Sequence, residues 1–516
     1  MTGKKEITRA ASSFSFATIL SRLLGFLRDM ILARYLGASG ISDAFFVAFR
    51  IPNLMRDLFA EGSMSSAFIP VLTEVNLREG PKETIRIARL TLTLILVVVG
   101  SFTVAGIVFS PCIVKIIAPG FQDPGKIDTT VLLTRIMFPF LLFVSLAAFA
   151  MGALNVKGVY FVPALASAWF NITIIITIIV VVYFFHNPLI AAAIGVTIGG
   201  FMQFATQVPS YLRQGYSLRP LTGFNNPHIR KMGMLIVPVM FGQAVGQLNI
   251  FISTLLASYL QEGSITYLYY SMRLIQFPIG IFGVAMAMAV LPTLSRHAAS
   301  GDISSLRSDL SYGLRLLFYL AIPSMAGLIA LREPIISMLF QRGQFTYADT
   351  VQTAFSLVFY CIGIWSMVGN KVMVSAFYSL KDTATPVKIA ALALLLNVGL
   401  SLVLMGPLRH GGLALANSLS SWVNFLILFY ILRRRLRGVE GRAIVRSSVK
   451  ITTASLLMGV VLSLLSSAGI WAQGGRFLEK SLLLAALISG GTILYLVLSK
   501  VMHIRELRDV IAVVRR

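Results

Sequence analysis

Apolar segments long enough to cross a lipid bilayer recur along almost the whole chain. The hydrocarbon core of a bilayer is about 30 Å thick, and an α-helix needs about twenty mainly apolar residues to cross it. Backbone N–H and C=O groups find no water in that core, so apolar runs of this length predict helices that satisfy their own hydrogen bonds. Charged residues make up only 12% of the 516 residues. The sequence therefore predicts an all-α polytopic membrane protein.

The apolar runs predict fourteen transmembrane helices. Two further apolar stretches, Pro111–Phe121 and Pro334–Phe340, are too short to cross the membrane and are interpreted as re-entrant or interfacial pieces. The predicted transmembrane helices lie at about residues 13–36, 41–73, 84–110, 128–156, 158–185, 188–213, 233–260, 264–295, 305–331, 347–380, 384–405, 410–434, 447–470 and 478–502.

Two distant segments of the chain resemble each other. The run ILARYLGASGIS (Ile31–Ser42) aligns with LLASYLQEGSIT (Leu255–Thr266), and six predicted helices separate the two copies. Because that number is even, both repeats enter the membrane in the same sense, which predicts two six-helix lobes in parallel repeat. The alternative is a chance match between apolar sequences. The predicted parts are an N-lobe at 1–215, an amphipathic linker at 216–232, a C-lobe at 233–436 and two C-terminal helices at 437–516.

The basic residues are distributed unevenly between the predicted loops. With the N-terminus placed in the cytoplasm, 28 of the 44 lysines and arginines fall on the cytoplasmic side and eight on the opposite side. This asymmetry follows the positive-inside rule and places both chain ends in the cytoplasm. The net charge of +24 is then explained by topology and by attraction to anionic lipid headgroups rather than by nucleic acid.

Several arginines lie inside segments that lipid is predicted to surround. A charged side chain at the bilayer centre costs roughly 2.5–3.5 kcal/mol on insertion scales, so such residues are expected to face water, a counter-ion or an anionic ligand. On the first predicted helix, Arg22 and Arg28 share one polar arc with Ser21 and Asp29. The arc predicts that this helix lines a cavity.

A second cationic helix face is predicted in the other lobe. There Arg273 shares a face with Thr266 and with Tyr269, although Pro278 is expected to kink the helix just after the arginine. Transporters built from two repeats bind their substrate at the repeat interface near the bilayer midplane. We therefore expect both lobes to point cations and hydroxyls into a common space.

Ion pairing between helices is the alternative explanation for these charges. Asp29 can pair with Arg28, and Asp57 can pair with Arg56. In the second predicted span, Pro52 and Gly62 interrupt the helix and leave both interpretations open for its charges, among them Asp43, Arg50 and Glu61. Cations outnumber carboxylates around Arg22, Arg28 and Arg273, which favours an anionic ligand there.

The residue chemistry also indicates the class of ligand. The planar fork of donors of arginine suits phosphate or carboxylate groups, whereas an exporter of organic cations would need carboxylates facing its cavity. Hydrophobic walls around such a site suit a lipid-linked anion. A membrane transferase would need paired carboxylates for Mg²⁺ or acid–base work, and the sequence has no such cluster and no P-loop. We predict a transporter with no metal or cofactor, driven by the membrane potential or an ion gradient.

Four motifs occur in order along the chain. They are SRLLGFLRDMILARYLGA with DAFFVAFRIPNLMRDLFAEGSMSSAFIP, YYSMRLIQFPIGIFGVA with LPTLS, FQRGQFT, and FYSLKDTATPVKIA. They resemble the motifs of the MurJ (MviN) family of lipid II flippases, within the MOP exporter superfamily. The resemblance implies two six-helix lobes around a cavity, alternating access, and a groove for the undecaprenyl tail formed by the last two helices. It also implies that lipid II, a precursor of peptidoglycan, moves from the inner to the outer leaflet of the bacterial cytoplasmic membrane.

The resemblance assigns roles to individual residues. The functional arginines of the family correspond to Arg22, Arg28, Arg56 and Arg273, and the aspartate of its DAFF motif corresponds to Asp43. The predicted substrate-binding set is Ser21, Arg22, Arg28, Asp29, Asp43, Arg56, Glu61, Thr266 and Arg273.

One departure from the family pattern lies in the second lobe. Members of the family have acidic residues where this chain has Met272 and Gln276, so a mechanism that needs those carboxylates does not transfer. A flippase for another undecaprenyl-linked polysaccharide and a MATE-like exporter are the alternative functions. Membrane lipids and cell-wall synthesis proteins are the expected further partners.

The predicted topology can be tested by cysteine labelling. Cysteines introduced by Lys4→Cys and Arg437→Cys should react only with reagents that reach the cytoplasm, because the basic segments containing them are predicted to stay there. Labelling of either position by an impermeant reagent added from the periplasmic side would contradict the topology.

Overall fold

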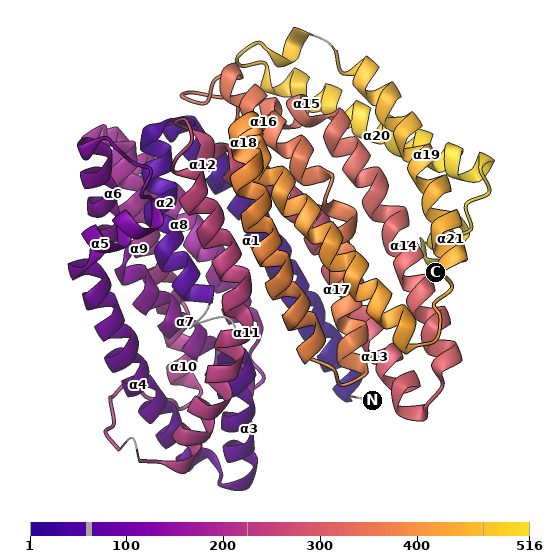
Figure 1. The fold of residues 1–516 in the computed structure, drawn as a ribbon. Helices are drawn as coiled ribbons and strands as arrows, with labels where there is room; N and C mark the ends of the chain where they lie inside the picture. Colours follow the sequence, from indigo (N-terminus) through magenta and orange to yellow (C-terminus); the bar gives the residue numbers. More distant parts are fainter. Residues whose placement is uncertain (1, 58–63, 224, 468, 515–516) are drawn as a thin grey trace. The chain divides into compact units, whose positions relative to one another are not determined.

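The fold consists of helices joined by short turns (Figure 1). The computed structural model describes residues 2–57, 64–223, 225–467 and 469–514, and within these ranges it contains no strand. The chain divides into two compact units, Met1–Glu262 and Gly263–Arg516. The predicted all-α class is therefore confirmed for the part of the chain that is described.

The first unit contains eleven α-helices and one π-helical segment among its described residues. They are α1 (Thr2–Leu36), α2 (Gly40–Arg56), η2 (Met64–Phe68), α3 (Ile69–Arg78), α4 (Pro81–Val108), α5 (Ser110–Ile117), α6 (Pro124–Met137), α7 (Pro139–Val156), α8 (Phe161–Phe185), α9 (Pro188–Ala205), α10 (Val208–Arg213) and α11 (Pro227–Ala257).

The second unit contains the remaining described elements. They are α12 (Ser264–Pro278), η3 (Ile279–Val284), α13 (Ala285–Ser300), α14 (Ile303–Ala330), α15 (Arg332–Phe340), α16 (Tyr347–Cys361), α17 (Ile364–Ser379), α18 (Ala384–Arg435), α19 (Gly441–Leu465), η4 (Gly469–Trp471), α20 (Phe477–Val501) and α21 (Glu506–Val514).

Polar caps fix where many of these helices begin. Asp123 accepts hydrogen bonds from the backbone N–H groups of Gly125 and Lys126 at the start of α6. Asn187 and Asn226 cap α9 and α11 in the same way, and a proline follows each of these three caps. A cap satisfies N–H groups that have no partner within the helix, and proline at the first helical position loses nothing because its missing donor would be unpaired there.

Nine described helices, or helix pairs that run on without a sharp bend, are long and apolar enough to cross a membrane. The pair α16 and α17, bent by 42°, would make a tenth if it forms one span. The short helices α5 and α15, of eight and nine residues, occupy the two stretches predicted to be too short to cross. A polytopic membrane fold is thus supported, while the count of fourteen stays a prediction.

The longest helix, α18, contains a sharp break. A straight helix of its 52 residues would be about 78 Å long, more than twice the thickness of a bilayer core. At Arg409 the backbone has φ 50° and ψ −131°, which is not helical. Figure 1 accordingly shows α18 as two orange helical segments. The break lies between the two predicted spans at 384–405 and 410–434.

Proline also interrupts the helix that carries Arg273. The α-helix α12 ends at Pro278, and the chain continues through the π-helical turn η3 into α13. Proline removes a backbone donor and clashes with the preceding turn, which explains a break at this point. The predicted disturbance after Arg273 is therefore present. In α2, by contrast, the helix runs through Pro52, and Gly62 and Glu61 lie outside the described residues.

Helix α11 packs within the first unit. Its first turns are tied to α3, where the Lys231 ammonium lies 2.6 Å from the Glu74 carboxylate and His228 lies 2.9 Å from Glu79. The hydrogen bond from Lys231 lowers the pKa of Glu74. From the sequence we assign this helix to the C-lobe, beginning at residue 233, whereas the compact units divide after Glu262. The predicted lobe boundaries stay a prediction.

The two C-terminal helices dock on the second unit at several points. The Tyr495 hydroxyl of α20 donates to the Tyr319 carbonyl of α14 at 2.9 Å, and the buried Lys480 donates to Ser337 of α15 at 2.8 Å. Helix α21 is held by a 3.1 Å ion pair between Arg315 and Glu506. These contacts make α20 and α21 an integral part of this unit, and α19 packs against α14.

Close packing of α8 against α9 depends on small residues. A Cβ atom added at Gly199 of α9 would lie 2.9 Å from the Phe170 ring and 3.0 Å from its carbonyl oxygen, and one at Gly195 would lie 3.3 Å from the Ile174 Cα. Glycines four residues apart let two membrane helices approach backbone to backbone.

Enlarging Gly199 should therefore destabilise the first unit. We expect Gly199→Leu to lower the free energy of unfolding by about 1–3 kcal/mol, because the carbonyl of Phe170 cannot move away as a flexible side chain would. Thermal unfolding of the purified protein in detergent measures the effect. The matched control is Gly100→Leu on α4, where an added Cβ meets nothing within 4 Å. Equal melting temperatures for the two variants would contradict this packing.

Candidate functional site

The predicted site begins on α1, where Arg28 forms an ion pair with its neighbour Asp29. Two guanidinium nitrogens of Arg28, Nε and Nη2, donate to Oδ1 of Asp29 at 3.0 and 2.7 Å. The two residues are 8% and 0% exposed, and the guanidinium lies 6.0 Å from the Phe170 ring centroid. The pair neutralises a buried charge within one helix, so the ion-pair alternative holds for Arg28 in this structure.

The other predicted arginine of α1 has a different environment. Arg22 is exposed and forms no ion pair with any described residue. Its neighbour Ser21 contributes its backbone carbonyl, which accepts a hydrogen bond at 3.2 Å from the Asn171 side chain of α8. Asn171 therefore fixes the backbone of α1 at this position, while the guanidinium of Arg22 stays accessible.

A second pair lies at the end of α2. The Arg56 guanidinium donates to Oδ1 of Asp57 at 3.1 and 2.8 Å, and Oδ2 of Asp57 accepts a hydrogen bond from Gln247 of α11 at 3.1 Å. About a quarter of each side chain of the pair is exposed. The predicted site residue Glu61 follows in the segment that lies outside the described residues.

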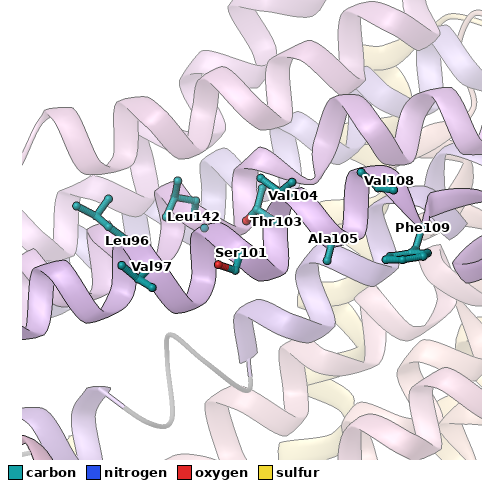
Figure 2. Close-up of a pocket in the computed structure, with 10 residues that line it drawn as sticks. Leu96, Val97, Ser101, Thr103, Val104, Ala105, Val108, Phe109 and Leu142 are labelled. Atoms are coloured by element: carbon teal, nitrogen blue, oxygen red, sulfur yellow. The ribbon is translucent and has the colours of Figure 1, made fainter. Parts of the chain in front are cut away.

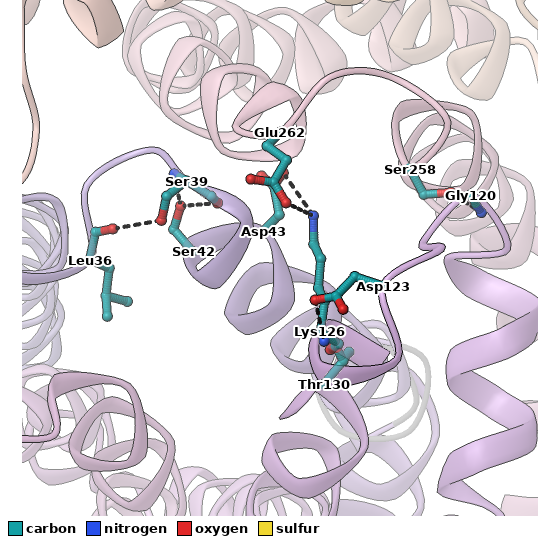
Figure 3. A network of polar contacts seen from close by, with 10 residues as sticks. All are labelled: Leu36, Ser39, Ser42, Asp43, Gly120, Asp123, Lys126, Thr130, Ser258 and Glu262. Atoms are coloured by element: carbon teal, nitrogen blue, oxygen red, sulfur yellow. Dashed lines mark hydrogen bonds and ion pairs between the residues drawn. The ribbon is translucent and has the colours of Figure 1, made fainter. Parts of the chain in front are cut away.

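The start of α2 carries Asp43 in a charged cluster that we name the Lys126 cluster. It consists of Asp43, Lys126 and Glu262 (Figure 3), and the ring of Phe121 lies against the lysine. The Lys126 ammonium lies 3.9 Å from Asp43, 3.4 Å from Glu262 and 4.1 Å from the Phe121 ring centroid. Asp43 is 2% exposed, so this lysine offsets a buried carboxylate.

Close backbone approaches hold the loop after α11 beside this cluster. The Ser258 hydroxyl accepts a hydrogen bond from the Gly120 N–H at 3.0 Å, and a Cβ at Gly120 would lie 2.4 Å from the Ser258 backbone. A Cβ at Gly40 would meet the Glu262 carboxylate in the same way. The cluster and these two glycines fasten the end of α11 to the beginnings of α2 and α6 (Figure 3).

In the second unit, α12 carries the predicted residues Thr266 and Arg273. Thr266 is fully buried and Arg273 is partly buried. Met272 is also partly buried and Gln276 is exposed, so neither supplies a carboxylate beside the arginine. Two residues before Arg273, the buried Ser271 hydroxyl lies 2.7 Å from that of Ser356, and this contact packs α12 on α16.

Two cavities lie away from these charged residues. One is a groove of about 800 Å³ along α4, lined mainly by apolar side chains such as Val97, Val104 and Phe109, with Leu142 of α7 beside them (Figure 2). The other has a volume of about 1200 Å³ and lies at the turn between α18 and α19. Neither cavity includes a residue of the predicted substrate-binding set.

Lys126 and Glu262 are polar partners that the sequence did not reveal. From the sequence, Lys126 counts only as one of the basic residues on the outer side, and Glu262 has no assigned role. Their link to Asp43 joins three segments that are far apart in the chain. The one available signal is the Asp123 cap with Pro124, which fixes the start of α6 and hence the position of Lys126.

Comparison with known sequences identifies one family that matches most of this chain. The family model described as "Lipid II flippase MurJ" matches residues 32–481. The chain is 34% identical to a probable lipid II flippase MurJ of Vibrio cholerae serotype O1, over 98% of each sequence. It is also 34% identical to the lipid II flippase MurJ of Burkholderia cenocepacia, over 83% of this chain and 84% of that one.

Comparison with solved structures identifies the same family. A solved structure of lipid II flippase MurJ in an inward closed conformation matches with a TM-score of 0.79 and 28% identity, over 96% of this chain and 99% of the other. An inward-facing MATE family multidrug resistance transporter of the MOP superfamily matches with a TM-score of 0.66 over 83% of this chain, and its 14% identity shows a shared fold alone. From its sequence and its fold together, the chain belongs to the MurJ family of lipid II flippases.

Proposed function

We propose that this chain translocates lipid II from the inner to the outer leaflet of the cytoplasmic membrane, and that cavity arginines bind the anionic diphosphate headgroup. Membership of the MurJ family supports the substrate. The observation that carries the headgroup proposal is the presence of arginines in helices of both units, Arg22 on α1 and Arg273 on α12. Arginine offers a diphosphate paired N–H donors in a fixed geometry.

Arg28 and Arg56 would act differently from these two. Each is already bound to the aspartate that follows it, so a diphosphate must share or displace that carboxylate. Such a pair keeps the arginine oriented and neutralised when no substrate is present. Competition with the carboxylate would also weaken the final complex, which favours release after translocation.

Alternating access of the two lobes is the proposed motion. Parallel repeats around one midplane site can expose it first to one side and then to the other. The proposed substrate-binding set remains as predicted, with Ser21, Asp29, Asp43, Glu61 and Thr266 beside the four arginines. The membrane potential or an ion gradient would supply the energy, with no resident metal or cofactor. Both ends of the chain are proposed to lie in the cytoplasm.

Two alternatives share parts of this chemistry. A flippase for another undecaprenyl-linked glycan would use the same arginines, and assays with different lipid-linked substrates separate it from the proposed function. A MATE-like exporter of organic cations shares the fold. It would need carboxylates without cationic partners in its cavity, whereas Asp29, Asp43 and Asp57 each lie within 4 Å of a lysine or an arginine.

Removing the proposed headgroup ligands should stop transport without affecting insertion. Arg22→Ala, Arg28→Ala or Arg273→Ala should each reduce lipid II translocation in proteoliposomes by tenfold or more, since truncating one partner of a desolvated charge pair costs roughly 2–5 kcal/mol. The corresponding lysine variants should recover only part of the activity, because lysine lacks the bidentate fork.

The matched control is Arg135→Ala on α6. The guanidinium of Arg135 donates to the Ser110 hydroxyl at 3.0 Å, which is a packing contact outside the proposed site. This variant should transport normally. Normal translocation by the triple variant that lacks Arg22, Arg28 and Arg273 would refute the headgroup proposal.

The Arg28–Asp29 pair allows substrate binding to be separated from structural pairing. Asp29→Asn should lower the thermal stability, because it leaves a buried guanidinium without its closest carboxylate, a loss of roughly 3–5 kcal/mol for a broken buried pair. The double variant Arg28→Gln with Asp29→Asn should recover most of that stability while remaining unable to translocate lipid II. If the double variant regains both stability and transport, Arg28 has only a structural role.

A further inference from the structure

The cavity between α18 and α19 combines an apolar wall with a cationic rim. We call it the α18–α19 cavity, and its volume is about 1200 Å³. Its wall includes the aromatic side chains of Phe318, Trp365, Phe425 and Phe429, which come from α14, α17 and α18. Phe425 packs against the rings of Phe318 and Trp365 with centroids 6.0 and 5.3 Å away, so this wall is a preformed aromatic surface.

The cationic rim comes from both helices that form the turn. Arg433 lies in the last turn of α18, and Arg442 and Arg446 lie four residues apart in the first turns of α19. None of the three forms an ion pair within the described part of the chain. The one acidic side chain that lines the cavity is the exposed Glu440. The cavity is therefore lined by three guanidinium groups and one carboxylate. The N-terminal end of α19 adds partial positive charge.

A neighbouring arginine that does not line the cavity forms an ion pair within the fold. Arg435 pairs with Asp382 at 2.6 Å. Hydrogen bonds from the N–H and hydroxyl of Thr385, together with this arginine, lower the pKa of Asp382, so the carboxylate is ionised. Arg435 thus joins the end of α18 to the turn that precedes the start of the same helix. None of the three rim arginines forms a comparable ion pair with a described residue.

An apolar wall joined to a cationic rim fits an amphiphile with one anionic end. We infer that the α18–α19 cavity binds an anionic glycerophospholipid, with its phosphodiester among Arg433, Arg442 and Arg446 and an acyl chain along the aromatic wall. Basic residues next to a membrane helix attract anionic lipids, and the distribution of basic residues predicts that this turn faces the cytoplasm. The site is independent of the proposed substrate-binding set.

The surroundings of the cavity favour a lipid from the bilayer over a soluble anion. Leu426, Val445 and Val449 are 53%, 62% and 60% exposed on the same helices, as expected for side chains that face acyl chains. The groove along α4 in Figure 2 is a useful contrast, because its lining is apolar with two hydroxyl groups and contains no charged side chain. That groove can hold an acyl chain, but it offers nothing that selects an anionic headgroup.

Bound lipid would stabilise the attachment of the C-terminal helices. Its headgroup would bridge the end of α18 and the start of α19, which are joined by the short connection 436–440. Repulsion among the rim arginines would fall when a phosphate binds between them. Binding to the folded state alone then raises the stability in proportion to the logarithm of the lipid concentration.

Native mass spectrometry of the purified full-length protein tests the inference. Phosphatidylglycerol and phosphatidylcholine with identical acyl chains serve as the probes. We expect phosphatidylglycerol to bind more tightly, and the double variant Arg442→Gln with Arg446→Gln to weaken its binding about tenfold. The control Arg434→Gln removes one charge from the same turn of α18 without touching the cavity, and it should bind as the unaltered protein does.

Two further variants separate loss of charge from loss of fold. The double variant Arg442→Lys with Arg446→Lys keeps the charge and should retain most of the binding. Thr452→Trp fills the cavity without removing any charge and should weaken phosphatidylglycerol binding several-fold. Size-exclusion profiles and helical circular dichroism should stay unchanged in all variants.

Three results would overturn the inference. The first is unchanged phosphatidylglycerol affinity in the double glutamine variant or in Thr452→Trp. The second is equal affinity for phosphatidylcholine, which would mean that the headgroup charge is not recognised. The third is full displacement of phosphatidylglycerol by an equimolar amount of undecaprenyl phosphate, which would assign the cavity to a polyprenyl chain instead.

Discussion

The structure depends on how charges are neutralised inside a membrane protein. A buried ion is costly unless a partner and hydrogen bonds accompany it, and Arg28 with 8% exposure and Asp29 with none meet that condition together. Because the two residues are adjacent, the pair forms within α1 whatever the neighbouring helices do. The same arrangement recurs where Arg56 at the end of α2 meets Asp57. In both pairs the arginine is neutralised by the next residue of the chain, before any ligand is present.

The positions of the helices were largely predictable because hydropathy alone determines which segments can cross a bilayer. The two short apolar stretches appear as α5 and α15, and α12 ends at Pro278, a residue that lacks a backbone donor. The break inside α18 was not predictable in its form, because it depends on the non-helical backbone with positive φ at Arg409. The contacts of α11 with Glu74 and Asp57 had no signal in the sequence, because these partners are distant along the chain.

The candidate site was predictable only where its partners lie close together in the chain. Adjacency made the Arg28–Asp29 and Arg56–Asp57 pairs visible as an alternative, although counting cations against carboxylates favoured an uncompensated Arg28. In the structure Arg28 is compensated, since one carboxylate oxygen of Asp29 accepts two hydrogen bonds from its guanidinium. The Lys126 cluster joins three remote segments, and no local pattern in the sequence brings Asp43, Lys126 and Glu262 together.

The arginines of the proposed site therefore fall into two physical classes. Arg28 and Arg56 each have an aspartate next in sequence that neutralises them, whereas Arg22 and Arg273 have no acidic residue within four positions. In this chain Met272 and Gln276, rather than carboxylates, lie close to Arg273 in the sequence. At Arg28 and Arg56, an anionic headgroup would compete with a carboxylate that is already bound. Such competition would limit how tightly a carrier holds a charged headgroup, and a carrier must also release it.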